Sequence, residues 1–130
     1  MSEVWSRFYA AAGETPRDTL LDALNRFAEE GREPGIAVDL GSGTGRDAVE
    51  LLRRGWRVVA VDAQPEAIER LRAHPDARSR SEALETVLAR FEDARWPFAD
   101  LVNSSFSPPF CPPSAFEATW HLFHVVARRP

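Results

Sequence analysis

The apolar positions of this chain alternate between a helical period and short runs. Apolar side chains recur every three or four positions in three segments that are bounded by proline, glycine or a capping residue, which predicts helices over 15–31, 46–54 and 65–74. Apolar runs between turn residues predict buried strands at 36–40, 57–61 and 99–102. Strands that alternate with helices through short links favour a parallel sheet with right-handed crossovers.

The remaining segments are less regular. Residues 81–93 fit a capped helix better than a strand on periodicity alone. Residues 76–81 are polar and are predicted to form a surface loop, and 107–114 contain four prolines, which predicts a rigid loop. The tail from Phe116 to Ala127 has the apolar spacing of a closing helix.

Composition narrows the class of protein. A length of 130 residues fits one domain, and the net charge of −4 argues against nucleic acid as a partner. Cys111 is the single cysteine, which excludes an internal disulfide and suits a reducing compartment. No apolar run reaches the length of a membrane span and the N-terminus lacks the layout of a signal peptide, so we expect a cytoplasmic protein without membrane contact. His121 and His124 lack acidic partners, so no metal site is expected.

The stretch VDLGSGTG at 38–45 carries the strongest chemical signal. Glycines allow positive φ and bring backbone N–H groups against a ligand. A dinucleotide turn needs a glycine at its sixth position, where this chain has Arg46, and an anionic pyrophosphate disfavours the flanking Asp39 and Asp47. Asp62 closes the next strand, where such folds place a carboxylate that binds ribose hydroxyls. The pattern therefore indicates a nucleoside with a positive charge, and argues against a nicotinamide oxidoreductase.

With these residues in place, 37–45 followed by 59–62 resembles the class I S-adenosylmethionine-dependent methyltransferases. Residues 91–98 are similar to that family's third ligand segment, and 100–105 resemble its fourth strand and the residues that face the substrate. The leading stretch 5–17 is similar to the N-terminal cap helix and lid of small bacterial members of the tellurite-resistance type.

The resemblance implies an α/β fold, with a Rossmann-like, doubly wound and mostly parallel sheet of about four strands in the order 3-2-1-4 and an N-terminal cap helix. It implies a single domain over 1–130 with a lid at 1–14, and it makes 86–91 a strand in place of the helix that periodicity favours. Since the family has three further strands, we expect a C-terminally truncated domain. Its fourth strand would be an uncovered edge, which a second copy could cover in a homodimer.

The resemblance also implies an S-adenosylmethionine site. The residues implied to bind this cofactor are Asp39, Gly41, Ser42, Gly43, Gly45, Asp62, Ala63, Asp93 and Ala94. Asp39 would orient the methionine amino group, Asp62 would hold the ribose hydroxyls, and Asp93 would accept from the adenine amino group. Asn103 and Ser104 are the candidate catalytic residues, because the end of the fourth strand lies near the transferred methyl group in this family.

The function that the resemblance implies is methyl transfer from S-adenosylmethionine to a small-molecule acceptor. Transfer from a sulfonium depends on positioning and desolvation, so it requires no nucleophile–base pair. The alternative is a non-catalytic S-adenosylmethionine-binding module that needs a partner.

Overall fold

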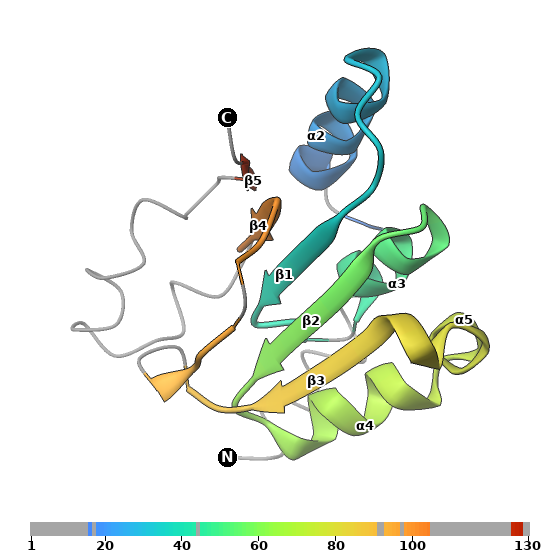
Figure 1. Ribbon diagram of the computed structural model, residues 1–130. Helices are drawn as coiled ribbons and strands as arrows, with labels where there is room; N and C mark the ends of the chain where they lie inside the picture. Colours follow the sequence, from blue (N-terminus) through green and yellow to red (C-terminus); the bar gives the residue numbers. More distant parts are fainter. Residues whose placement is uncertain are drawn as a thin grey trace.

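The computed structural model, drawn in Figure 1, describes residues 16, 18–43, 45–90, 93–96, 98–104 and 126–128. Its helices are α2 (Asp18–Glu29), α3 (Arg46–Arg53), α4 (Pro65–Ala73), α5 (Pro75–Ser79) and the 3-10 turn η1 (Ser81–Ala83). Its strands are β1 (Ile36–Leu40), β2 (Arg57–Asp62), β3 (Leu84–Leu88), β4 (Leu101–Asn103) and β5 (Val126–Arg128). The predicted α/β class is therefore confirmed.

The strands form one sheet in the order β3-β2-β1-β4-β5. The first four are parallel, which confirms the predicted order 3-2-1-4. β5 runs antiparallel to β4, with Ala127 opposite Val102. Two expectations are therefore wrong. The predicted closing helix is wrong at its end, where 126–128 form a strand, while 116–125 lie outside the described residues, and the outer edge of β4 is paired with β5. The pairing of β4 with β5 removes this reason to expect a homodimer, which itself stays a prediction.

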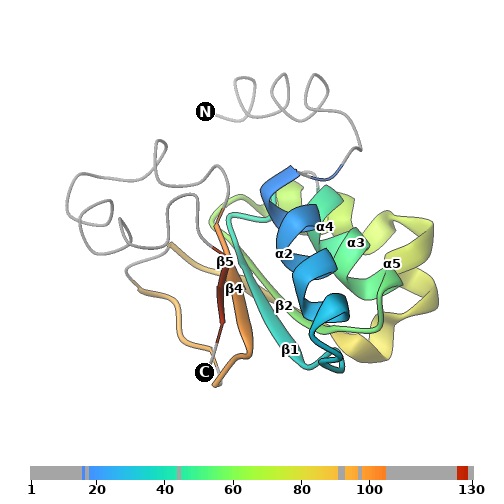
Figure 2. The ribbon, with the colours of Figure 1, turned by 90° about the horizontal axis from the view of Figure 1, so that it is seen from above.

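The described helices lie on one side of the sheet, as Figure 2 shows. The apolar cluster between helices and sheet includes Ala37, Val58, Ala60 and Leu101 from the strands. The intervening residues, such as Val38, belong to a second apolar cluster on the other face. Successive strand residues point to opposite faces of a sheet. The helix-facing side therefore also receives Asp62 at the end of β2, Asn103 at the end of β4, and Asp39, the fourth residue of β1. Those three residues are polar, and they lie at or next to the carboxyl ends of neighbouring parallel strands.

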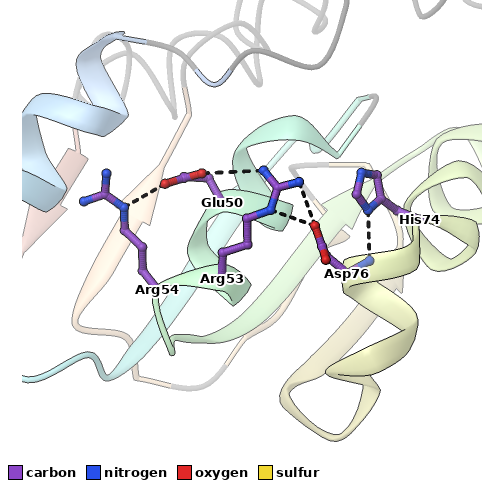
Figure 3. Close-up of polar contacts among 5 residues, drawn as sticks. All are labelled: Glu50, Arg53, Arg54, His74 and Asp76. Atoms are coloured by element: carbon purple, nitrogen blue, oxygen red, sulfur yellow. Dashed lines mark hydrogen bonds and ion pairs between the residues drawn. The ribbon is translucent and has the colours of Figure 1, made fainter.

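Helices α2, α3 and α4 lie within the three predicted segments. The predicted loop at 76–81 is wrong, because Pro75 occupies the first position of a further helix, α5. His74 caps this helix: its Nδ1 accepts a hydrogen bond from the backbone N–H of Asp76 at 3.1 Å. Figure 3 shows that the Asp76 carboxylate also binds Arg53 of α3, at 2.6 Å, so an ion pair connects the two helices. Glu50 lies between the Arg53 and Arg54 side chains in the same group.

The helix that periodicity predicted over 81–93 is also wrong. Residues 84–88 form β3, whose five residues all pair with β2, so sheet pairing overrides the local helical period. The strand that the resemblance implied at 86–91 is therefore confirmed in kind, with its bounds moved toward the N-terminus. On β3, Thr86 accepts hydrogen bonds from the Arg72 guanidinium of α4, which ties this edge strand to its covering helix.

Several predictions lie outside the described residues. These are the lid at 1–14, the proline-rich loop at 107–114, Cys111, His121 and His124. Within the described ranges, no helix is long and apolar enough to cross a membrane.

Candidate functional site

The glycine turn connects β1 to α3 at the carboxyl end of the sheet. Gly41, Gly43 and Gly45 all have positive φ, at 73°, 57° and 85°. The N–H groups of Gly41 and Ser42 donate to the carbonyl of Val61 at 2.7 and 3.1 Å, which anchors the turn to β2. The predicted turn is therefore present, and its shape depends on left-handed backbone that glycine adopts without strain.

Gly45 has a second role in packing. A Cβ at Gly45 would lie 2.8 Å from Cδ1 and 3.2 Å from Cβ of Leu71 on α4. In dinucleotide turns, the glycine that permits such close packing stands at the sixth position. Here Gly45 combines this close approach with a positive φ, and α3 begins immediately after it at Arg46. The absence of glycine at position 46 is thereby explained.

Asp62 holds the turn against the start of α4. Its Oδ2 accepts from the N–H of Gly43 and its Oδ1 from the N–H of Gln64, both at 2.9 Å. Burial raises the pKa of Asp62, and the hydrogen bonds from backbone N–H groups oppose part of this rise. Each carboxylate oxygen has a second lone pair, so Asp62 can accept a ligand hydroxyl while it holds the turn. Ala63, directly after it, is exposed.

Asp39, Asp47 and Asn103 form a buried polar cluster, which we call the carboxyl pair and its bridging amide. Asn103 Nδ2 donates to Asp39 Oδ1 at 2.9 Å and to Asp47 Oδ2 at 3.1 Å. The exposed fractions are 2% for Asp39, 7% for Asp47 and 1% for Asn103. The sheet register places Asn103 of β4 beside Asp39 of β1, and the first turn of α3 brings Asp47 to the same amide.

The surroundings of Asp39 disfavour its ionised form. Burial is the largest cause and the neighbouring Asp47 carboxylate is the next, and together they raise the pKa of Asp39 to about 8. The hydrogen bond from Asn103 lowers the pKa, Asp62 raises it, and Arg46 lowers it by the smallest amount. The acid that the sequence placed beside the turn is therefore a carboxyl group that holds its proton near neutral pH.

Three buried polar atoms at this edge of the sheet have no hydrogen-bond partner in the described part of the chain: Asp39 Oδ2, Ser42 Oγ and Ser104 Oγ. Leaving a buried polar atom unsatisfied costs about 1–3 kcal/mol. The three come from β1, from the glycine turn and from the end of β4. They therefore point to a polar ligand that would supply the missing hydrogen bonds.

The two residues of the third ligand segment differ in exposure. The side chain of Asp93 is 61% exposed and forms an ion pair of 3.5 Å with Arg90. Ala94 is buried in the apolar cluster on the sheet face opposite the helices. The structure thus brings together Asp39, Ser104 and the glycine turn, which Asp62 of β2 holds in place. Asp93 lies at the surface.

Asp47 is a candidate site residue that the sequence pattern indicates only as a charge flanking the turn. A signal for it was present, because Asp47 shares the buried face of α3 with Leu51, one helical turn later. A carboxylate on the buried face of an amphipathic helix needs a partner inside the protein. Among the described residues, no three or more His, Cys, Asp or Glu side chains form a metal-binding group.

Comparison with known proteins agrees on one family. A family model described as a methyltransferase domain matches residues 37–129. The release factor glutamine methyltransferase of Chlorobaculum tepidum is 34% identical in an alignment of 118 residues that covers 82% of this chain and 38% of the relative. The chain therefore spans little more than a third of that relative's length.

Two solved structures show the same fold. One, from Methanococcus maripaludis and assigned as an S-adenosyl-L-methionine-dependent methyltransferase, has a TM-score of 0.63 at 20% identity and covers 81% of this chain and 50% of its own. The other, an RNA methyltransferase from Salinibacter ruber in complex with S-adenosyl-L-homocysteine, has a TM-score of 0.59 at 20% identity, with 84% and 70% covered. At these identities the likeness concerns the fold.

Proposed function

This chain belongs to the methyltransferase domain family, within the class I S-adenosylmethionine-dependent methyltransferases, and from that premise we propose that it transfers a methyl group to a small-molecule acceptor. The observation that carries the methyl-transfer part of the proposal is the buried Asp39 carboxyl group, whose Oδ2 has no partner in the described chain and lies beside a glycine turn. Family membership implies S-adenosylmethionine as the cofactor.

The residues present fit that cofactor. The unpartnered Asp39 Oδ2 would accept from its amino group, and Asp62 from its ribose hydroxyls while still holding the turn. The backbone of the glycine turn would lie against the methionine part, as in the sequence-based proposal. Ala63, Asp93 and Ala94 remain proposed adenine contacts.

Methyl transfer from a sulfonium requires of the protein mainly that it position the reacting groups. When bound, the cofactor supplies a methyl group that its sulfonium has already activated. The chain's residues then have to orient the reacting groups and keep water out, which can account for about 7–11 kcal/mol of a barrier. Ser104 remains a candidate for contact with the acceptor, because its buried Oγ has no partner within the described residues. Asn103 is a weaker candidate, since both hydrogens of its Nδ2 are directed at carboxylates.

The proposed class of methyl acceptor rests on the net charge of the chain. A net charge of −4 disfavours a polyanionic substrate, which supports a small molecule over nucleic acid. A protein acceptor is the second candidate, because the 34% identical relative is named as a release factor glutamine methyltransferase. The single cysteine supports our proposal of a cytoplasmic location.

Calorimetric titration of the full chain tests the cofactor. We expect heat of binding with S-adenosylhomocysteine and none with NAD. Asp39→Asn should weaken binding roughly 10- to 100-fold, because a hydrogen bond to a charged group contributes about 1.5–3 kcal/mol. Asp22→Asn, at an exposed carboxylate of α2, is the matched control and should bind as the parent does. Heat with NAD alone would contradict the proposal.

Transfer itself is tested with S-adenosylmethionine labelled in its methyl group. Label in small-molecule products supports the proposed acceptor class, and label in a glutamine-containing peptide would favour the second candidate. Binding without transfer to either class would favour a non-catalytic module.

A further inference from the structure

The buried cluster at Asp39 has a use beyond holding the cofactor. We infer that Asp39, which the Asn103 amide bridges to Asp47, holds a proton in the ligand-free chain and releases it when a cationic amino group binds to Asp39. Asn103 is then a positioning residue that acts through Asp39. The inference rests on the proposed function for the identity of the ligand.

The geometry places the two carboxyl groups together. Both accept from one nitrogen atom, Asn103 Nδ2, at 2.9 and 3.1 Å. Three separate elements, β1, α3 and β4, supply the three side chains, so the cluster exists only in the folded sheet. Ionisation of Asp39 in this buried position is costly, because the neighbouring Asp47 carboxylate disfavours a second negative charge beside it.

The charged groups around Asp39 reinforce this effect. Asp47 and Arg46 face it from α3, and Asp62 faces it from β2. Burial is the largest cause of the raised pKa of Asp39, and the two acidic neighbours add to it, while Arg46 has the smallest influence, so the pKa rises to about 8. Within the described residues, the hydrogen bond that favours ionisation of Asp39 comes from Asn103.

The unpartnered oxygen explains why a ligand would remove the proton. Asp39 Oδ2 is buried without a hydrogen-bond donor in the described chain. A cationic amino group at this oxygen supplies both a donor and an opposite charge, and each favours the ionised carboxylate. The proton leaves the carboxyl pair for the solvent, so the pair gains one negative charge opposite the ligand's positive charge. A ligand without the amino group leaves the proton in place.

The experiment measures protons released on binding. The full chain is titrated with S-adenosylhomocysteine at about pH 6.5 in buffers of different ionisation enthalpy, and the dependence of the heat on the buffer counts the protons. With the pKa of Asp39 at about 8, the group is almost fully protonated at that pH, so release should approach one proton per ligand. Methylthioadenosine, which has the nucleoside and the thioether but lacks the cationic α-amino group of the amino-acid part, is the matched ligand and should release none.

Variants separate this role from a structural one. Proton release is measured as a function of pH, and its midpoint is the pH at which half a proton is released per ligand. Asp47→Asn removes a charge beside Asp39, so this midpoint should move to lower pH. Asn103→Leu removes the hydrogen bond that favours ionisation, so the midpoint should move up. A merely structural role for Asn103 would weaken binding without moving the midpoint. Asp22→Asn should leave the release unchanged.

The outcomes distinguish the two proposals. Binding of S-adenosylhomocysteine with heat that does not depend on the buffer overturns the inference and leaves the proposed function intact. Equal proton release with methylthioadenosine also overturns it, because the amino group would not be the cause. The absence of any binding heat overturns the proposed function and this inference together. Asp47→Asn is nearly isosteric, so it tests the midpoint even if Asn103→Leu fails to fold.

Discussion

Replacement of Gly45 with alanine tests whether the turn requires glycine for packing as well as for conformation. The backbone at Gly45 has a φ of 85°, which costs an alanine about 1–2 kcal/mol. The new Cβ would also lie 2.8 Å from Leu71 Cδ1 and 3.2 Å from Leu71 Cβ, and such overpacking adds about 1–3 kcal/mol. We therefore expect the free energy of unfolding to fall by about 2–5 kcal/mol, a large part of the about 5–15 kcal/mol typical of a domain.

Urea denaturation followed by tryptophan fluorescence measures this change, and Gly31→Ala is its control. Gly31 has a φ of 70°, but a Cβ there would meet nothing within 4 Å, so only the conformational cost applies. Leu71→Ala in the Gly45→Ala background removes the 2.8 Å contact with Cδ1 and keeps the one with Cβ, so the two substitutions together should cost less than the sum of their separate costs. If Gly45→Ala costs no more than Gly31→Ala, the packing argument fails.

Three further predictions concern charged groups. The pKa of Asp39 is raised from 3.8 to about 8, so its contribution to the free energy of unfolding is complete below about pH 4 and is lost as the pH rises through about 8. In this window the parent should lose up to about 1.4 kcal/mol per pH unit relative to Asp39→Asn. Urea denaturation across pH measures the difference. Asp62→Asn leaves an amide that cannot accept from both Gly43 and Gln64, so we expect a loss of about 1–3 kcal/mol in the free energy of unfolding, and an unchanged urea midpoint would refute this. Asp76→Ala removes the exposed ion pair with Arg53 and should cost less than about 1 kcal/mol, with a smaller loss in high salt; a loss that salt does not reduce would contradict the assignment.

The sequence predicted the elements whose signals are local. Strand β1 has the predicted bounds, and α3 and α4 end within a residue of theirs, because glycine and proline mark these boundaries in the chain itself. Strand β3 was misassigned by periodicity, because its pairing with β2 is a tertiary contact that no local pattern contains. Strand β5 was missed for the same reason, since it exists by pairing with β4.

The site divides in the same way. The glycines, Asp39 and Asp62 belong to one short motif with a spaced acid, and the sequence was sufficient to find them. The partnership of Asn103 with Asp39 joins residues 64 positions apart in the chain, and that with Asp47 joins residues 56 apart. Asn103 therefore looked like a residue facing the acceptor, while the structure directs its amide at two carboxyl groups.

The spacing of the glycines connects these findings. Because Gly45 supplies the close contact with Leu71, α3 can begin at the next residue, and its second position then carries Asp47 to the Asn103 amide. Because this turn has no glycine at its sixth position, helix α3 begins there, and its second residue, Asp47, completes the carboxyl pair. A dinucleotide site directs helix N–H groups at an anion, whereas here the same edge of the sheet buries Asp39 and Asp47 beside the turn. A cationic ligand favours the ionised form of Asp39 and an anionic one disfavours it, so we expect the sign of the ligand's charge to determine which nucleosides this fold accepts.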